Sequence, residues 1–287
     1  MDYIELLNRI EIYKNKYDVR EIGETYFKRK IFAVERILDK KFATAIFVSS
    51  IHARENISTD LVCKMIDEGL FENIKNFNLS FILMANPDGV ELSKNGLKNI
   101  QKKYHKNLIK INKNSKNFSL WKANGRGVDL NNNFDANFGT NIGSNVPASS
   151  GYAGVRFESE CETQAIVNYL QNNKTFFVIN YHTKGEEIYY NFFQDGGRLE
   201  RDKLIAERFA ISTGYTIKNP EMVSSGGLKD YCVLKLKIPS LTIELGNDNL
   251  VHPIEKEYLE EIFERHKTIA KDLEFAYNVF IDYQGKL

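Results

Sequence analysis

The chain has 287 residues, which fits one large α/β domain or two small ones, because a single core grows to roughly 250–300 residues before it splits. Hydrophobic residues make up 43% and charged residues 27%, an ordinary globular balance. The formal net charge is +1, so the overall electrostatics give no reason to expect nucleic acid or an anionic membrane as a partner.

The N-terminal segment and the cysteines bear on the compartment. Charges interrupt residues 1–18 every few positions, which predicts an amphipathic helix and not a signal peptide. No stretch approaches the ~20 apolar residues that cross a bilayer. The cysteines are odd in number and far apart, which argues against a disulfide framework or a thiolate metal site (Cys63, Cys161 and Cys232). We therefore expect a cytoplasmic protein.

Strands and helices alternate along most of the chain. Apolar, β-branched and aromatic runs predict strands at Ile31–Arg36, Ala43–Ser50, Leu79–Ala85, Phe176–His182 and Ser240–Leu245. Amphipathic patterns predict helices at about Ser58–Glu72, Ser159–Asn172, Arg198–Thr213, Leu228–Lys235 and Glu255–Tyr277. This alternation predicts a mostly parallel or mixed sheet covered on both sides. Because no repeat or linker interrupts it, we expect one domain over residues 1–287, led by a helix at about 1–18.

One stretch departs from this alternation. Residues 93–157 are rich in Asn, Gly, Ser and Lys and show little periodicity. A long irregular stretch inside a compact domain is usually functional. Within it, lysines cluster between Lys94 and Lys116, a pattern that is typical of a solvated surface and sometimes of a rim that faces the substrate.

The first chemically distinctive motif follows the predicted strand Ala43–Ser50. His52 and Glu55 stand three residues apart on the turn that leaves this strand and enters a helix. Ligands in α/β sheets gather at the carboxyl ends of strands, and imidazole and carboxylate both suit Zn²⁺ at about 2.0–2.2 Å. The pair therefore indicates two metal ligands. Taken alone, it also fits a surface salt bridge between Arg54 and Glu55 beside a loop histidine.

His182 is the candidate third ligand. It ends the predicted strand Phe176–His182, which places it at the same edge of the sheet, although a partly buried structural histidine would also fit there. Two histidines and one glutamate leave a fourth position open, as in catalytic zinc sites, so we expect one Zn²⁺ per chain. His105 in the lysine-rich stretch, His252 after the last strand and His266 on the final helix fit less well.

Glu244 lies near the end of the apolar strand Ser240–Leu245. Because an unpaired buried carboxylate is costly, its side chain must meet a cation, a water at a metal or a solvated cleft. At a zinc site such a carboxylate takes the proton of the attacking water and passes it to the leaving amine. The alternative is a structural ion pair with a nearby Lys or Arg.

The segment Trp121–Phe134 carries further polar groups. Asp129 can accept a hydrogen bond from a ligand histidine and so fix its tautomer. Arg126 can stabilise an oxyanion, and Asn131 can bind a substrate carbonyl or carboxylate. In isolation the segment also fits a polar loop with an Asn-rich turn.

Together these pieces resemble the zinc carboxypeptidase (funnelin) family. The resemblance spans roughly residues 40–275 and rests on six motifs in the family's order, which are H-x-x-E (52–55), N-P-D-G (86–89), G-V-D-L-N-x-N-F (127–134), G-Y-A-G with S-E-x-E-T (151–154 and 159–163), Y-H (181–182) and T-I-E-L-G (242–246).

The resemblance implies an α/β fold with a central mixed, twisted sheet flanked by helices. It implies Zn²⁺ on the two histidines and the glutamate named above, with Glu244 as general base and then acid. It also implies a cationic group that polarises the scissile carbonyl. We expect Arg126 in this role; the alternative is Lys122, which follows the tryptophan where the family often has its arginine.

Two positions depart from the family's carboxypeptidases. Their D-L-N-R-N-F motif has an arginine that clamps the terminal carboxylate of the substrate, whereas this chain has Asn132, whose neutral amide lacks the charged, bidentate grip of a guanidinium. Where they have a tyrosine ahead of the D-[WY] pair, this chain has Met222. The candidate substrate-binding residues are therefore Asn131, Asn132, Lys122 and Met222, and recognition of a free C-terminus is altered.

These departures resemble a bacterial branch, the γ-D-glutamyl-L-diamino acid endopeptidases, which cut cell-wall peptides. Residues 226–231 (G-G-L-K-D-Y) resemble that branch's G-Y-K-D-W segment, and its members also replace the clamping arginine. Many relatives carry a peptidoglycan-binding repeat before the catalytic domain. Because this chain shows none, we expect soluble muropeptides as substrates.

Three other functions stay open. The first is a metallocarboxypeptidase for ordinary peptides, with the carboxylate held by Asn131 and a cation such as Lys122. The second is an amidohydrolase that removes an acyl group from an amino acid, which the G-Y-A-G loop and the long N-P-D-G to D-L-N stretch disfavour. The third is a catalytically silent peptide-binding module, which is disfavoured because all three ligands and Glu244 are present together.

Overall fold

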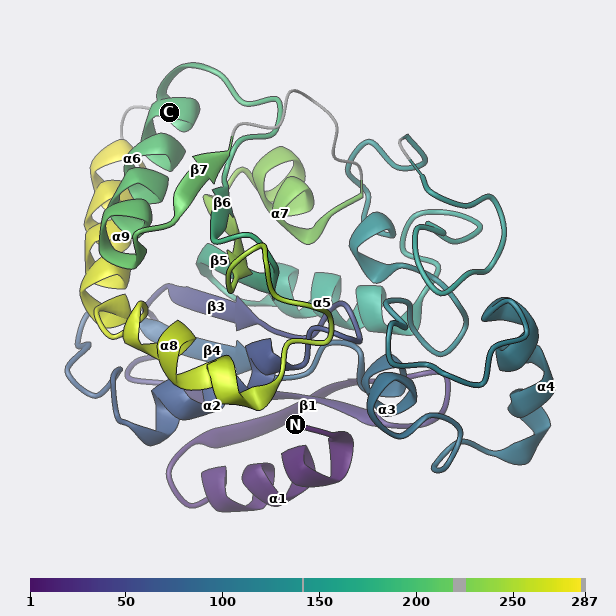
Figure 1. Cartoon of the computed structure of the whole chain (residues 1–287). Helices are drawn as coiled ribbons and strands as arrows, with labels where there is room; N and C mark the ends of the chain where they lie inside the picture. The colour runs from purple at the N-terminus through teal and green to yellow at the C-terminus, as the bar shows by residue number, and fades with distance from the viewer. Residues whose placement is uncertain (141, 219–225, 285–287) are drawn as a thin grey trace.

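The computed structural model describes residues 1–140, 142–218 and 226–284. In this part of the chain a mixed sheet of eight strands runs through the molecule in the order β1-β2-β4-β3-β5-β8-β6-β7 (Figure 1). The strands are β1 (Asp18–Glu24), β2 (Lys30–Arg36), β3 (Thr44–Val48), β4 (Asn78–Ile82), β5 (Thr175–Thr183), β6 (Glu187–Tyr189), β7 (Thr216–Lys218) and β8 (Ser240–Leu245).

The centre of the sheet is parallel and its margins are partly antiparallel. Strand β3 pairs in parallel with β4 and β5, and β5 pairs in parallel with β8. Strands β1 and β2, β2 and β4, and β6 and β8 pair antiparallel. Every residue of β3 and β4 is buried, as expected for strands covered on both faces. The predicted mixed α/β sheet is confirmed.

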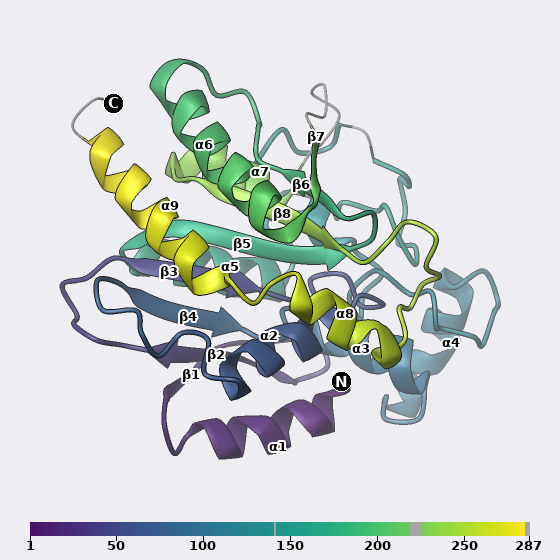
Figure 2. The ribbon, with the colours of Figure 1, turned by 60° about the vertical axis from the view of Figure 1, so that its left-hand side comes forward.

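Helices cover both faces of the sheet. The α-helices are α1 (Tyr3–Tyr13), α2 (Ile57–Asp67), α3 (Pro87–Asn95), α4 (Lys102–Ile111), α5 (Cys161–Asn172), α6 (Gly196–Thr213), α7 (Leu228–Tyr231), α8 (Leu259–Glu264) and α9 (Ile269–Gln284). Helices α1, α2, α6, α8 and α9 pack in one apolar cluster against one face, and α2, α6, α8 and α9 are seen in front of the sheet in Figure 2. Helices α5 and α7 form a second cluster on the opposite face. No described helix is long and apolar enough to span a bilayer.

The predicted continuous helix Glu255–Tyr277 is wrong. The structure has a 3-10 turn at Lys256–Tyr258, then α8, a break at residues 265–268, and α9. The break is stabilised locally, because the buried His266 donates from Nδ1 to the carbonyl of Ile262 at 2.8 Å and from its backbone N–H to the carbonyl of Phe263. The N-terminal helix is also shorter than predicted, since α1 ends at Tyr13.

The stretch predicted to be irregular, residues 93–157, contains one full helix and the end of another. Helix α3 begins at Pro87, where the Asn86 side chain accepts the N–H of Gly89 at 3.0 Å. Helix α4 presents four lysines to solvent and buries Leu108 in a third apolar cluster with Phe27 and Trp121. From Asn112 to Glu160 the described chain has only a 3-10 turn at Leu130–Asn132, so most of this stretch is irregular as predicted.

Candidate active site

The register of the sheet brings three strand ends together. Val48, the last residue of β3, lies opposite Asn180 of β5, and His182 of β5 lies opposite Glu244 of β8. Since the three strands run in parallel, their carboxyl ends open on the same edge of the sheet. His52 follows β3 by four residues and reaches the same place.

A tight turn carries the chain from β3 to His52. Ser50 has a φ of 51°, in the left-handed region that a residue with a side chain rarely adopts. Its N–H donates to the hydroxyl of Ser58 at 2.9 Å, and its own hydroxyl lies 2.7 Å from that of Thr59, so the start of α2 holds the turn. The chain then reverses again, because the N–H of Glu55 donates to the carbonyl of His52. The two side chains therefore point to one centre.

His52, Glu55 and His182 form a buried cluster. The Nδ1 atoms of the two histidines lie 2.9 Å apart, and each lies 3.0 Å from an oxygen of Glu55. Burial tends to raise the pKa of the Glu55 carboxyl, but the two adjacent imidazoles hold this pKa well below its usual range. The carboxylate is therefore ionised and available as a ligand.

This cluster fits a zinc ion. Its ligand atoms lie within 4.8 Å of one another, and ligands on a tetrahedral zinc at about 2.1 Å are about 3.4 Å apart. Two imidazole nitrogens and a carboxylate are a zinc donor set. A cation bound between the two Nδ1 atoms would also remove the repulsion between their lone pairs. The residues that would hold the ion are thus His52, Glu55 and His182.

Each histidine has a polar side chain beside its outer nitrogen. Nε2 of His52 lies 3.2 Å from Oδ1 of Asp129, and Nε2 of His182 lies 2.7 Å from the side-chain amide of Asn180. When Nδ1 binds a metal, Nε2 carries the proton, which the Asp129 carboxylate is suited to accept. The Asn180 atom beside His182 is Nδ2, and the amide turned over would present its oxygen to this proton. Burial tends to raise the pKa of Asp129, but Lys122 and His52 hold it far below its usual range.

Glu244 stands beside this cluster without joining it. Burial, opposed by the charge of His182 and assisted by that of Glu55, raises the pKa of the Glu244 carboxyl to about 7. A carboxyl with a pKa near neutrality can both accept and donate a proton at pH 7, as a general acid/base must. The side chain is only partly buried, so water can reach it.

The structure separates the two cations that were candidates for polarising a carbonyl. Nζ of Lys122 lies 3.3 Å from Oδ2 of Asp129, and the negative charges of Asp129 and Glu55 raise its pKa against the opposing effect of burial. Arg126 lies elsewhere: its side chain is 45% exposed, stacks over the ring of Tyr26 and faces Glu160 at 3.5 Å. Lys122, and not Arg126, thus stands next to the histidine–glutamate cluster.

Of the predicted substrate-binding residues other than Lys122, the structure describes Asn131 and Asn132. Asn131 accepts the N–H of Leu228 at 3.0 Å and lies 3.5 Å from the amide of Asn180, so it joins the start of α7 to the His182 strand. Asn132 packs against Gly226, where a Cβ would come within 2.3 Å of the Asn132 carbonyl oxygen. Met222 lies outside the described residues.

Two residues of the site were not predicted from the sequence. Asn180 precedes His182 by two positions and so shares its side of the strand, which is a signal that the period of a β-strand offers. Arg54 stands between two of the ligands, and its Nε is buried without a hydrogen-bond partner in the part of the chain described. The Arg54 guanidinium is thus a candidate donor to a substrate, which a simple H-x-x-E motif does not reveal.

Comparison with known proteins identifies this arrangement. The profile of the zinc carboxypeptidase family matches residues 3–268. The chain belongs to the zinc carboxypeptidase family. Since the family is one of zinc peptidases and the three buried ligands are in place, the chain is a zinc metallopeptidase.

Individual members of the family resemble the chain at different levels. It is 28% identical over 273 residues to γ-D-glutamyl-L-diamino acid endopeptidase 1 of Lysinibacillus sphaericus, covering 88% of this chain and 67% of that protein. It spans about two thirds of the length of the curated relatives that it matches. The fold matches bovine thrombin-activatable fibrinolysis inhibitor with a TM-score of 0.78 at 20% identity, over 97% of each chain. It matches the murein-tripeptide amidase MpaA of Escherichia coli O157 with a TM-score of 0.54 at 17% identity, over 91% of this chain and 94% of that one.

Proposed function

We propose that this chain hydrolyses the amide bond between γ-D-glutamate and a diamino acid in soluble peptides derived from the cell wall. The observation that carries the proposal is a complete hydrolytic site beside a neutral Asn132, where carboxypeptidases of the family have their carboxylate-clamping arginine. The similarity to an endopeptidase named for this bond supports it, since that similarity covers 88% of the chain.

Each residue of the site has a separate role in the proposed reaction. His52, Glu55 and His182 would hold a zinc ion, which when bound would supply a Lewis acid for the water and the scissile carbonyl. Glu244, whose carboxyl has a pKa of about 7, takes a proton from the attacking water and later returns it to the leaving nitrogen. Asp129 and Asn180 fix the imidazole rings through their outer nitrogens.

Lys122 is the group that we assign to the developing oxyanion. Its ammonium stays charged beside Asp129 and projects from the segment that follows Trp121 into the same cluster. A fixed charge in a water-poor site stabilises negative charge more strongly than an exposed one does. Arg126 is assigned no part in this step, because its guanidinium faces Tyr26 and Glu160.

Recognition of the substrate is assigned to neutral groups and to Arg54. A γ-linked glutamate keeps a free α-carboxylate, which the unpartnered Nε–H of Arg54 is suited to bind. On the amine side, Asn132 lies against Gly226, just before α7, and brings no clamping charge to this position. Such a surface can bind a diamino acid without a bidentate ion pair to its carboxylate.

Two peptides test the proposal. Zinc-loaded protein is incubated with L-Ala-γ-D-Glu-diaminopimelate and, separately, with a hippuryl substrate of carboxypeptidases, and the products are weighed by mass spectrometry. We expect release of diaminopimelate from the first and no cleavage of the second. Glu244→Gln serves as the control, because it should keep the zinc and cut neither.

The reverse result would identify an ordinary metallocarboxypeptidase, in which Asn131 and Lys122 hold the terminal carboxylate. Turnover of neither peptide, with tight binding of one, would identify a silent peptide-binding module. Either outcome would overturn the proposed cleavage, and both leave the family assignment intact because it does not depend on the substrate.

A further inference from the structure

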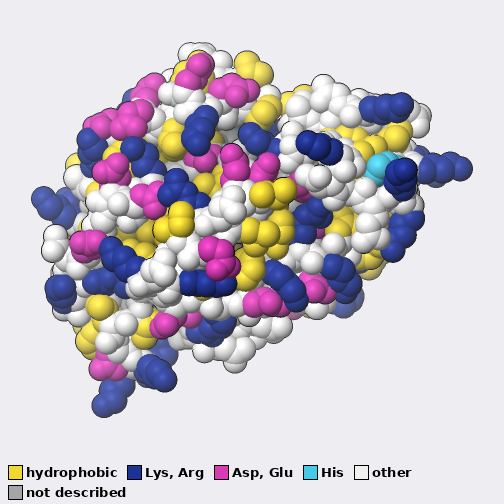
Figure 3. Space-filling view, turned by 90° about the horizontal axis from the view of Figure 1, so that it is seen from below, with side chains coloured by type: hydrophobic (Ala, Val, Ile, Leu, Met, Phe, Trp, Pro, Cys, Tyr) yellow, Lys and Arg dark blue, Asp and Glu magenta, His cyan; other side chains and the backbone are white. Residues whose placement is uncertain are grey.

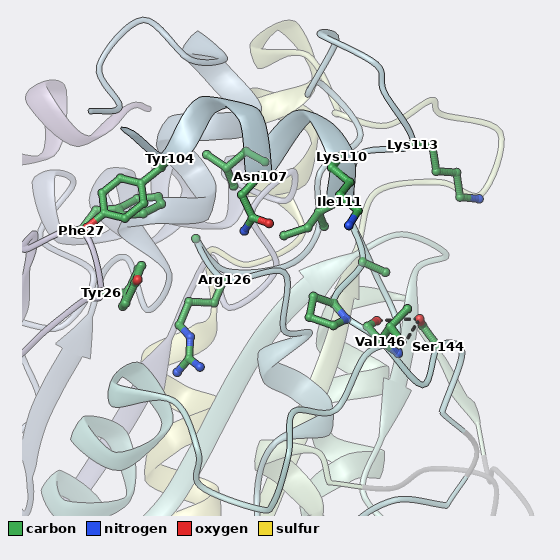
Figure 4. Close-up of a pocket in the computed structure, with 14 residues that line it drawn as sticks. Tyr26, Phe27, Tyr104, Asn107, Lys110, Ile111, Lys113, Arg126, Ser144 and Val146 are labelled. Carbon is green, nitrogen blue, oxygen red and sulfur yellow. Dashed lines mark hydrogen bonds between the residues drawn. The ribbon is translucent and has the colours of Figure 1, made fainter. Parts of the chain in front are cut away.

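A second cavity opens away from the histidine–glutamate cluster. It has a volume of about 710 Å³, within the usual range of small-molecule sites (Figure 4). Its walls come from the turn between β1 and β2, from α4, and from two loops around Arg126 and Val146. None of the roles proposed above uses this cavity.

One wall is aromatic. The ring of Tyr104 lies 4.6 Å from that of Phe27 and 5.6 Å from that of Tyr26, between ring centroids. Close packing of the neighbouring turn keeps the wall in place, because a Cβ on Gly125 would come within 2.7 Å of the Phe27 ring. The amide of Asn107 points into the same space from α4 (Figure 4). Flat apolar faces with a nearby amide suit a sugar ring, which offers C–H groups on its faces and hydroxyls at its edge.

The rim is cationic. Lys110, Lys113 and Arg126 line the cavity, and none of the described residues that line it is acidic. The two lysines form no ion pair with any carboxylate of the described chain. They belong to a longer run, since residues 92–128 contain nine lysines and one arginine and no acidic residue. In Figure 3 Lys and Arg gather at the α4 end of the molecule, and no acidic side chain is seen among them. An anionic group is therefore attracted to this end.

The cavity lies on the same edge of the sheet as the active site. Strand β2 runs antiparallel to β4, so the turn before it, with Tyr26 and Phe27, extends past the carboxyl ends of β4 and β3. Two strand spacings, about 10 Å, separate β2 from β3. An apolar cluster also links Phe27 with Ala53, the neighbour of the ligand His52.

Two chain segments belong to both sites. The segment from Lys122 to Asp129 carries the amine beside the active site and, four residues on, the Arg126 side chain at the cavity. The loop at Val146 leads to Ser149, whose carbonyl accepts the N–H of Lys122, and then to Gly151, whose N–H donates to Asp129. The two sites are therefore connected by shared segments of the chain.

We propose that this cavity binds the N-acetylmuramyl sugar at the amino end of a muropeptide while its peptide stem occupies the active site. This inference rests on the proposed function. L-alanine and γ-linked D-glutamate separate the sugar from the bond that is cut, and two extended residues span about 7 Å, to which the γ-linkage and the lactyl group add length. The sugar packs on Tyr104, and its acetamido and hydroxyl oxygens accept hydrogen bonds from the Asn107 amide and the Lys110 ammonium.

A matched pair of substrates tests the inference. The zinc-loaded protein is given L-Ala-γ-D-Glu-diaminopimelate with either N-acetylmuramyl or plain acetyl on its amino end, and kcat/KM is measured for both. We expect the muramyl peptide to be preferred at least about tenfold, which corresponds to about 1.4 kcal/mol. Tyr104→Ala and Lys110→Glu should abolish the preference and leave the acetyl peptide within twofold of the unmodified enzyme. Lys106→Ala, on α4 but outside the cavity, should change neither.

Equal kcat/KM for the two peptides would overturn the inference. It would also be overturned if Tyr104→Ala and Lys110→Glu lowered kcat/KM equally for the muramyl and the acetyl peptide. Lys110→Glu keeps the test valid if Tyr104→Ala does not fold, because Lys110 is exposed. A binding measurement separates this inference from the proposed function. We expect calorimetry to detect binding of N-acetylmuramic acid to the intact protein, even if neither peptide is cut. Tyr104→Ala should weaken this binding at least tenfold. Absence of binding alongside cleavage of both peptides would leave the function standing and reject the cavity.

Discussion

Because we assign Lys122 to the scissile carbonyl, we expect replacement of Lys122 to lower kcat strongly and replacement of Arg126 to lower it little. Lys122→Met removes an ammonium that lies 3.3 Å from Asp129 and is mostly shielded from solvent. Removing one preorganised donor to an oxyanion lowers kcat by about 10²–10³-fold, or about 2.7–4 kcal/mol. Arg126→Met removes a guanidinium that is 45% exposed, whose pairing with Glu160 is worth at most about 1 kcal/mol. We therefore expect it to change kcat less than about fivefold.

The assay is kcat on L-Ala-γ-D-Glu-diaminopimelate without a sugar, so that the second cavity plays no part. Zinc content is measured by atomic absorption for each variant, because Lys122 also neutralises Asp129 and the loss of its charge must be separated from a loss of metal. Lys122→Arg should restore part of the activity, since it returns a charged donor. A fall of about 10²-fold in Arg126→Met, with Lys122→Met nearly unchanged at full zinc content, would refute the reasoning.

Three further predictions concern single side chains. Glu244→Gln should keep one zinc per chain and lose at least ~10²-fold in kcat, and unchanged activity would exclude Glu244 as the acid/base. Asn180→Ala should weaken zinc binding about 10–100-fold in a chelator competition, whereas Asn172→Ala on the exposed end of α5 should not; equal affinities would mean that Asn180 does not orient His182. Burial, with the nearby charges of Asp88 and Glu160, raises the pKa of Glu162 to about 8. The folded state thus keeps a proton that the unfolded chain loses above about 4.5, and stability falls as pH rises from about 4.5 to 8. Glu162→Gln should reduce this fall by a few kcal/mol in urea unfolding at pH 5.5 and 8; an identical pH dependence in both proteins would contradict it.

The interior of the fold could be predicted from local pattern. The strands β3, β4, β5 and β8 are short apolar runs bounded by polar residues, and such runs are read directly because they are buried on both faces. Strands β1, β6 and β7 were not predicted. They are at the margins of the sheet, two of them have three residues, and their side chains are partly exposed, so no hydrophobic period marks them.

Helices were harder where tertiary contacts set their limits. One amphipathic pattern covers α8 and α9, yet the chain turns between them because His266 satisfies the last carbonyls of α8. Helix α4 has few apolar residues, and its stability depends on burying Leu108 against the cluster around Phe27 and Trp121. Neither feature follows from the periodicity of the segment itself.

The sequence by itself determined the chemistry: which residue types can bind a metal, that they follow strand ends, and that Asn132 stands where the family resemblance places the arginine of a carboxylate clamp. These are local properties, since motif spacing and strand pattern are written along the chain. Only the tertiary structure decided which cation faces the active site. The turn at residues 124–128, with Gly127 at a φ of 77°, directs Arg126 toward Tyr26 and leaves Lys122 beside Asp129. It also placed α4 opposite the β1–β2 turn, more than seventy residues away in the chain, and so created a cavity that no short segment encodes.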